Sequence, residues 1–301
     1  MLVAIFVVLV LIALLLPAIQ SARESSRRTS CLNNLKQIGT ALSHYEATHK
    51  VYPRGINGQH WSAQMMLLPH LEQTALYNSF NFNVADPGGS MSDGEVNSTA
   101  GRTTVAVFCC PSDPDAGVMR PTTSYAWNGG YGLQSTDFVG SFGGGATRNS
   151  RTIKPSDITD GLSNTAAMTE WKVGHYNSSD DTAVVFKIAV RDSEGYSAFV
   201  ERCQSSNRQT TEFGNWTKKA WWSEGFYNSS LMNFNSPPNS LSCYYGGNID
   251  EGDWPASSYH SKGVNVLFHD NHTQYYRDST TMRIWNGIST RSGNEIVSQG
   301  N

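Results

Sequence analysis

Charge is scarce in this sequence, and basic residues are not in excess. Asp, Glu, Lys and Arg together make up 16% of the 301 residues, and the formal net charge is −3. Globular domains carry about a quarter of charged residues, and nucleic-acid-binding domains usually have a basic excess. We therefore expect no nucleic-acid partner.

Common catalytic and cofactor-binding motifs are also missing. The chain has no G-x-S-x-G, P-loop or H-E-x-x-H pattern, the signatures of several hydrolase, nucleotide-binding and metalloprotease classes. It has no C-x-x-C pair, so a zinc ribbon or a thioredoxin-type motif is not indicated. We expect no catalytic residues, no metal and no cofactor, and we predict that the protein is not an enzyme.

Cysteine is infrequent, with five residues scattered along the chain. If the domain that carries them lies outside the cytoplasm, one or two disulfides are expected, and one thiol is left over. We expect Cys203 to pair with Cys243, and Cys31 to pair with Cys109 or Cys110. Adjacent strand residues point to opposite faces, so only one of Cys109 and Cys110 is expected to pair.

The first part of the chain lacks charge altogether. Residues 1–16 are all apolar, and Pro17, Ala18 and Ile19 extend the run. A signal peptide would begin with a basic segment, which is absent, and a buried core helix rarely lacks a polar face over such a length. We therefore predict that residues 1–20 form the transmembrane part of a helix and that the lipid bilayer is a partner.

The helix is expected to continue beyond the membrane. Apolar residues recur there at spacings of three and four, which predicts an amphipathic spine over residues 21–50; they are Leu32, Leu35, Ile38, Leu42 and Tyr45. Pro17 is expected to kink the helix without ending it, because a proline in lipid can be accommodated locally. One helix from about Leu2 to about Thr48 follows.

The orientation of this helix is a conflict. Arg23, Arg27, Arg28 and Lys36 follow the apolar run, and the positive-inside rule would place that side in the cytoplasm. The large C-terminal part and its cysteines favour the outside. The residues alone leave the orientation open.

Further elements are expected after residue 51, where Gly, Pro and Asn break the helix. Residues 82–102 have the composition of an exposed loop, and a short terminal helix is expected over 282–288. Alternating or β-branched segments predict strands over 103–110, 166–170, 183–190, 263–269 and 274–277.

Several segments, in the same order, resemble one family. The stretch from Ile12 to Glu24, followed by Arg27, Arg28, Cys31 and residues 33–39, resembles the N-terminus of the planctomycete-type pseudopilin-like family. That family is a domain of unknown function with a prepilin-type N-terminus and a C-terminal H-x9-D-G motif. Four further elements are similar to its internal motifs: Leu67–Gln73 with Leu76-Tyr77, Phe108–Pro114, Ser124–Asn128, and Ile158–Thr165 with Glu170.

The resemblance implies an α+β, type IV pilin-like fold, with a long N-terminal helix packed on an antiparallel β-sheet domain with long loops. It implies that residues 51–301 form an extracytoplasmic domain in the periplasm or at the cell surface, in which residues 172–260 could be an insertion. The implied function is a membrane-anchored, single-pass structural or interaction protein of the cell envelope. Other pilin-like subunits of a filament or a type II secretion-like system would be its partners, through the N-terminal helix.

Two departures from the family pattern affect this interpretation. The prepilin cleavage site and the Glu that follows it are not found, since Met1 lies inside the apolar run; the start is misplaced, the chain is a fragment, or processing is lost. If Met1 is the true start, a tethered module that does not polymerise is favoured over a filament subunit. The C-terminal motif has Asn271 after Asp270 where the family has Gly, and both residue types tolerate a tight turn.

The polar residues of these motifs are expected to be structural. Asp270 and Asn271 would form a hairpin turn while His260 hydrogen-bonds locally, and Pro111 and Asp113 would form a turn. Asp160, Gly161 and Asn164 would form a second turn, which we favour over a Ca²⁺ site with Asp157. His260, His269, Asp270 and His272 are the one cluster with metal-ligand character, and we do not expect them to converge on an ion.

Aromatic residues gather in the second half of the chain, at Trp216, Trp221, Trp222, Tyr244, Tyr245 and Trp254. Exposed aromatic rings beside Asn and Asp would suit carbohydrate stacking, so a non-polymerising, membrane-tethered glycan-binding module is the alternative function. Large apolar groups are usually buried, and we favour packing under long loops.

Overall fold

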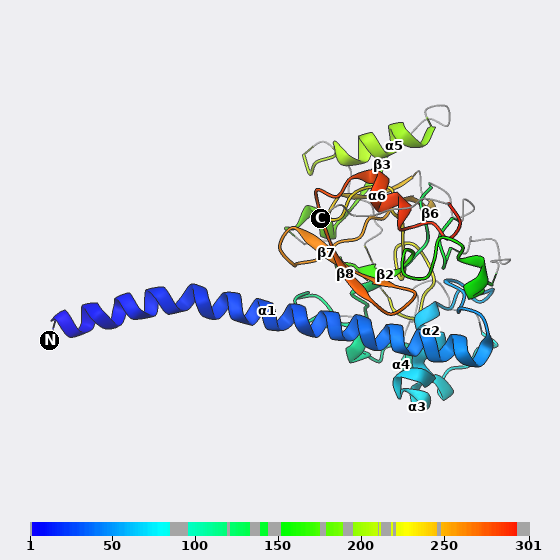
Figure 1. Cartoon of the computed structure of the whole chain (residues 1–301), viewed down its shortest axis with the longest axis horizontal. Coiled ribbons are helices and arrows are strands. Elements are labelled where there is room, and N and C mark those ends of the chain that lie inside the picture. The colour runs from blue at the N-terminus through cyan, green and yellow to red at the C-terminus, as the bar shows by residue number, and fades with distance from the viewer. Residues whose placement is uncertain are drawn as a thin grey trace.

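The computed structural model describes residues 2–84, 96–118, 121–132, 139–143, 152–174, 179–188, 195–209, 211, 218, 221–245 and 248–293. In this part of the chain a long N-terminal helix joins a domain of mixed strands, short helices and loops (Figure 1). Its sheets are mainly antiparallel. The architecture is the α+β, pilin-like one that was expected.

Helix α1 runs from Leu2 to His49 as one element and contains Pro17. The ribbon bows gently and does not break, and its first part stands clear of the domain (Figure 1). The helix is long and apolar enough to cross a membrane. The large apolar side chains of its first part are exposed, namely Ile5, Phe6, Leu9, Val10, Leu11, Ile12, Leu14, Leu15, Leu16 and Ile19.

The second part of α1 forms one side of the domain core. Cys31, Leu35, Ile38 and Leu42 are buried, at the three- and four-residue spacing of one helix face. Tyr45 extends the same face and is partly buried. This face packs against the hairpin formed by β7 (Gly263–Phe268) and β8 (Thr273–Arg277), and against the short helices of the 63–108 segment. The second part of α1 therefore lays one face on the domain, as the amphipathic pattern predicted.

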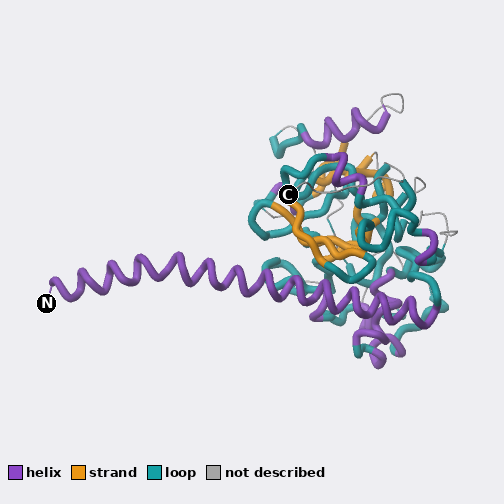
Figure 2. Tube along the Cα trace, in the orientation of Figure 1, coloured by secondary structure: helices purple, strands orange, loops and turns teal. Residues whose placement is uncertain are grey.

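The main sheet has five strands in the order β4-β1-β2-β7-β8. The described strands all lie in the domain, away from the part of α1 that stands clear of it (Figure 2). All neighbouring pairs are antiparallel except β1 with β4, which is parallel. The strands are β1 (Tyr125–Asn128), β2 (Ala166–Glu170), β4 (Leu231–Met232), β7 (Gly263–Phe268) and β8 (Thr273–Arg277). Strands β1, β2 and β7 are buried throughout, which explains why most of their side chains are apolar or small; Asn128, Glu170 and Asn265 are the buried exceptions.

A second sheet of three strands has its own small apolar core. It consists of β3 (Val185–Ile188), β5 (Ser242–Tyr245) and β6 (Asn248–Asp253), with helix α5 (Gly195–Gln204) packed against β3. All four elements lie within residues 172–260, the segment expected to be an insertion. Strand β4 of the same segment joins the main sheet instead.

Short helices complete the described part of the chain. They are α2 (Ala63–Leu67), η1 (Leu68–Leu71), α3 (Thr74–Asn78), α4 (Ser98–Gly101), η2 (Ala106–Phe108), η3 (Pro155–Asp157), η4 (Asp181–Ala183) and α6 (Met282–Gly287). The loop expected over 82–102 falls partly outside the described residues and ends in α4.

The strand predicted over 103–110 is wrong. Residues 106–108 form the 3₁₀ helix η2, and the backbone of Phe108 accepts a hydrogen bond from the Ser124 amide. Val105, Phe108 and Cys110 are nevertheless buried. The β-branched, apolar composition therefore indicated burial. A strand did not form, because no strand in the described part of the chain pairs with this segment.

The tip of the β7–β8 hairpin rests on α1 at a glycine. Asn271 has φ 69°, the left-handed conformation that a tight turn needs, and its side-chain amide donates to Thr40 Oγ1 at 3.1 Å. A Cβ on Gly39 would lie 2.1 Å from Asn271 Oδ1 and 2.9 Å from Leu267 Cδ1. The absence of a side chain at residue 39 is what lets the hairpin approach the helix.

We expect Gly39→Ala to lower the free energy of unfolding by about 1–2 kcal/mol, because the overpacking penalty exceeds the gain in helix propensity. In an Asn271→Gly background the same change should cost less, since the oxygen that the new methyl group meets is gone. Chemical denaturation of the four variants of this cycle measures the coupling. Equal costs in both backgrounds would show that the two residues do not interact.

Candidate functional site

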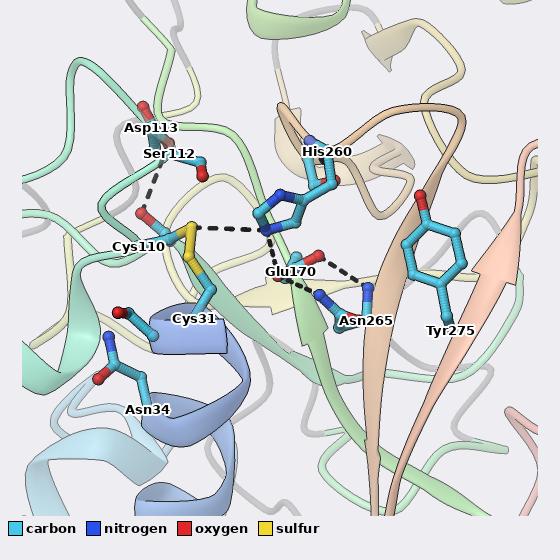
Figure 3. A network of polar contacts seen from close by, with 12 residues as sticks. Cys31, Asn34, Cys110, Ser112, Asp113, Glu170, His260, Asn265 and Tyr275 are labelled. Atoms are coloured by element: carbon cyan, nitrogen blue, oxygen red, sulfur yellow. Dashed lines mark hydrogen bonds and ion pairs between the residues drawn. A yellow bond between two sulfur atoms is a disulfide. The ribbon is translucent and has the colours of Figure 1, made fainter. Parts of the chain in front are cut away.

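A buried histidine joins three distant segments of the chain (Figure 3). His260 precedes β7, and its Nδ1 lies 2.9 Å from Oε1 of Glu24, which is on α1. Its Nε2 lies 3.1 Å from Oε1 of Glu170, the last residue of β2. The imidazole is therefore held between two carboxylates, one from the helix and one from the sheet.

The sheet register sets the position of Glu170. Strands β2 and β7 are paired with Thr169 opposite Val266, which places Glu170 beside Asn265. The Asn265 backbone amide donates to Glu170 Oε2 at 2.7 Å, and its side-chain amide donates to Oε1 at 2.8 Å. Glu170 is almost fully buried, so these donors stabilise a carboxylate that is shielded from solvent.

A disulfide bond lies near the same ring nitrogen of His260 that contacts Glu170. Cys31 of α1 is bonded to Cys110, and Cys110 Sγ lies 3.9 Å from His260 Nε2. Cys31 follows Glu24 by seven residues, close to two helical turns, so both face the domain. The sulfur atoms of the two cysteines, one oxygen of Glu170 and one nitrogen of His260 all lie within 4.8 Å of one another.

The charges in this cluster decide the protonation of His260. Burial by itself lowers the pKa of the imidazole, but the hydrogen bonds and negative charges of Glu170 and Glu24 outweigh it, so the pKa is raised. Ser112 Oγ also donates to Glu24 Oε1 at 3.0 Å. The protonated imidazole can donate to both carboxylates and tie α1 to the sheet.

We expect this imidazolium to make stability depend on pH. Its folded pKa lies above the ordinary value of 6.5, so its contribution is complete below that value and is lost as the pH rises through the folded pKa. The difference in unfolding free energy between wild type and His260→Gln should thus be largest below about pH 6.5 and shrink as the pH rises through the raised pKa of the folded state. Denaturation at several pH values measures it, and a difference that does not change with pH would contradict the assignment.

A second buried polar cluster adjoins the first. Lys218 is fully buried and donates to Ser257 Oγ and Thr182 O, both at 3.1 Å. Burial, helped by Lys172, lowers the pKa of Lys218 to about 7. Ser257 is fully buried as well, so no substrate reaches this Lys–Ser pair in the described structure.

Asp113 links the second cluster to the backbone. Its Oδ2 accepts from the Val173 amide at 2.8 Å and its Oδ1 from the Asp115 amide at 3.0 Å. Burial raises the pKa of the Asp113 carboxyl to about 6. Asp113, Glu170, Lys172 and Ser257 line a cavity of about 10 Å³ between the two clusters, among other residues.

The structure places the predicted motif residues in two different ways. Asp270 and Asn271 form the hairpin turn as expected. Gly161 has φ 98° in a turn where the Asn164 side chain donates to Asp160 O at 2.8 Å. His260 makes the local hydrogen bond that was expected, from its backbone amide to Ser258 Oγ at 3.1 Å. Its side chain contacts carboxylates that are 236 and 90 residues away in the chain, which was not expected.

The alternative metal sites named from the sequence do not converge. His269 is buried, with its Nε2 2.8 Å from Ser141 Oγ, and burial lowers the pKa of its imidazole to about 3. His272 contacts Asp270 at the exposed hairpin tip. Asp160 Oδ2 accepts from the Thr290 hydroxyl at 3.0 Å and the Gly293 amide at 2.7 Å, so this carboxylate joins its turn to the 290–293 segment.

The cysteine pairing agrees with the sequence in one bond and selects between alternatives in the other. Cys203 is bonded to Cys243, which joins α5 to β5. Cys31 is bonded to Cys110 and not to Cys109. The sequence could not distinguish the two, because adjacent cysteines have the same neighbouring residues, Pro111 and Asp113 among them. Cys109 keeps a thiol whose pKa is raised to about 11 by burial and by Asp113.

The aromatic residues of the second half are mostly internal. Trp222 and Trp254 are fully buried, Trp221 is 8% exposed and Tyr244 is 3% exposed. Tyr245 is partly buried against the second core, and Trp216 lies outside the described residues. The described aromatic rings therefore pack in the core, as the favoured interpretation expected.

Comparison with known proteins identifies the family. The chain matches, over residues 20–283, the family described as protein of unknown function (DUF1559). It belongs to that family, which agrees with the domain of unknown function that the motifs resemble. No curated protein and no solved structure matches the chain significantly.

The motifs of the resemblance meet at the histidine cluster. Glu24 and Cys31 belong to the N-terminal stretch, and Cys110 belongs to the Phe108–Pro114 motif. Glu170 goes with the Ile158–Thr165 motif, and His260 begins the C-terminal motif. Sequence reasoning treated these residues separately and missed both the role of Glu24 and that of Asn265. The local signal that could have pointed to the cluster was Glu170, a charged residue that ends the mostly apolar stretch Ala166–Glu170.

Proposed function

We propose that the protein is a membrane-anchored, pilin-like structural or interaction protein of the cell envelope, and not an enzyme. The observation that carries the proposal is the division of α1 into two parts. Its first part bears apolar side chains that contact nothing in the described structure, and its second part is built into the domain core. Lipid is the environment that suits such an apolar surface, since exposure to water would be costly.

Two features favour an extracytoplasmic domain. Two disulfides tie the domain, and disulfides persist in oxidising compartments. The basic residues after the apolar run are partly used by the fold: the Arg28 guanidinium lies 4.0 Å from the ring centre of Tyr275, and Arg27 lies 3.9 Å from Glu24. Arg28 is thus engaged by the domain and Arg27 by its own helix, and engaged cations are weaker evidence for a cytoplasmic side than free ones.

Within this class, we favour a subunit of a pilin-like or type II secretion-like assembly that associates through the apolar part of α1. The pilin-like fold and the family motifs support this role. The glycan-binding alternative has less support, because its tryptophans at 221, 222 and 254 are buried.

Membrane anchoring is tested by placing charge in the apolar part of α1. Leu11 and Leu15 are exposed, and each arginine at the centre of a span costs about 2.5–3.5 kcal/mol. Leu11→Arg with Leu15→Arg should release the chain from membranes that retain it through an alkaline carbonate wash. Leu11→Ala with Leu15→Ala is the matched control and should stay bound. A wild-type chain in the soluble fraction would overturn the proposal.

Orientation and assembly need two further measurements. Protease added to intact cells or spheroplasts should digest the domain if it is extracytoplasmic, and full protection would place it inside.

For assembly, Ile12→Cys on the apolar part should give oxidative cross-links between copies in membranes, while Glu201→Cys on the exposed face of α5 should not. The absence of cross-links at several apolar positions would favour a tether that does not polymerise.

A further inference from the structure

The disulfide beside His260 is half of a metal-ligand set. We propose that when the Cys31–Cys110 bond is reduced, the chain binds one zinc-type divalent ion with Cys31, Cys110, Glu170 and His260. The four donor atoms lie within 4.8 Å of one another and belong to four segments of the fold. All four residues are buried. This inference goes beyond the proposed function and does not depend on membrane anchoring.

The surroundings of His260 determine which of its two ring nitrogens is available to bind a metal ion, and this nitrogen faces the sulfurs. Its Nδ1 is 2.9 Å from the Glu24 carboxylate, so the proton of the neutral ring is held there. Nε2, at 3.9 Å from Cys110 Sγ and 3.1 Å from Glu170, is then left to coordinate. A carboxylate on the far nitrogen of a coordinating histidine is the usual second layer of a zinc site.

The carboxylate ligand has the same kind of support. Asn265 holds Glu170 through its backbone amide and its side-chain amide, one hydrogen bond to each oxygen. A carboxylate oxygen that accepts one hydrogen bond from Asn265 keeps a second lone pair for an ion, and one of the two oxygens lies within 4.8 Å of the other donor atoms. Ligands that are oriented before the ion arrives lose little conformational entropy on binding.

The donor types point to zinc among the divalent ions. Two thiolates, one imidazole and one carboxylate are soft to borderline donors, and four of them suit tetrahedral Zn²⁺ or its spectroscopic substitute Co²⁺. Mg²⁺ and Ca²⁺ prefer six or more oxygen donors. The neighbouring Cys109 is not part of the set, because its sulfur faces the Thr122 carbonyl.

The disulfide and the metal are mutually exclusive states. A dithiol reductant cleaves the Sγ–Sγ bond, and its two electrons and two protons leave two thiols on the chain and a disulfide on the reductant. Zn²⁺ then displaces both thiol protons, and any proton on His260 Nε2 leaves as well. In either state one link joins α1 to the segment that carries Cys110, covalent when oxidised and coordinate when reduced.

The test uses the full chain in detergent micelles, reduced under anaerobic conditions and titrated with Co²⁺. We expect one Co²⁺ per reduced chain, with a thiolate-to-cobalt charge-transfer band that Zn²⁺ removes by displacement. The oxidised chain should show no such band. A reduced, folded chain without the band would overturn the proposal, and so would equal binding by the oxidised chain.

Matched variants assign the ligands. Cys31→Ala with Cys110→Ala should abolish the band, whereas Cys109→Ala and the pair Cys203→Ala with Cys243→Ala should retain it. Glu24→Gln, at a half-exposed residue that the fold tolerates, should weaken Zn²⁺ affinity by about 10–100-fold through the histidine. A band that survives without Cys31 and Cys110 contradicts the assignment. Circular dichroism checks that each variant is folded. If the double cysteine variant is not, the affinity of folded Glu170→Gln for Co²⁺ decides instead: a weaker affinity is expected, and an unchanged one would contradict the assignment.

Discussion

Replacing both Cys31 and Cys110 with alanine should lower the free energy of unfolding by about 4 kcal/mol. The bond closes a separation of 79 residues, and the chain-entropy model gives about 4–5 kcal/mol for a loop of that size. It is also a covalent link between α1 and the 109–118 segment. Denaturation of the oxidised full chain in mild detergent, followed by tryptophan fluorescence, measures the loss.

Cys109→Ala is the control for this prediction, because its thiol makes no covalent bond and only a weak contact at 3.8 Å with Thr122 O. We expect a change of less than about 1 kcal/mol. If the double alanine variant were as stable as wild type, the bridge would not constrain the unfolded chain, and Cys31–Cys110 would not be the native pairing.

Glu170→Ala should cost about 3–5 kcal/mol of unfolding free energy. Glu170 is 1% exposed and accepts hydrogen bonds from both amides of Asn265 while it contacts His260. Removing one partner of a buried charge pair leaves the other without compensation, together with two unsatisfied donors. Chemical denaturation near neutral pH, where the imidazolium contributes, gives the largest difference.

Two variants make the origin of this loss clear. Glu170→Gln keeps one oxygen acceptor and the side-chain volume but removes the charge, so it should cost less than alanine. Glu201→Ala, at an exposed position of α5, should change stability by less than about 0.5 kcal/mol. If Glu170→Ala matched Glu201→Ala, the histidine cluster would make no net contribution to stability.

Local sequence patterns predicted several elements because their causes are local. The apolar run and the stripe of Leu35, Ile38 and Leu42 follow the helical period, and α1 extends from Leu2 to His49. Alternating apolar residues followed by Asp-Asn predicted the β7–β8 hairpin, because Asn tolerates the left-handed backbone conformation that a tight turn needs. The strand prediction for residues 103–110 was wrong because the apolar composition of the segment indicates burial and not strand pairing. Pairing needs a partner strand, which lies elsewhere in the chain.

The histidine cluster could not be derived in the same way. Glu24 looked like a residue of a polar helix face, and Glu170 like the end of a strand motif. Their meeting at His260 depends on the β2–β7 register and on the packing of α1 against the sheet, which are long-range properties. The choice of Cys110 over Cys109 is of the same kind, because adjacent cysteines share every local signal and differ in direction.

The amino-acid sequence by itself determined the anchor-like first part of α1, the buried stripe of its second part and the turns at Gly161 and Asn271. These depend on side-chain hydrophobicity and backbone preferences, which act within a few residues. Only the tertiary structure decided that Glu24, Glu170, His260 and a disulfide form one buried cluster. Electrostatic and hydrogen-bond energies depend on distance in space, and the fold alone brings residues 236 positions apart to within 2.9 Å.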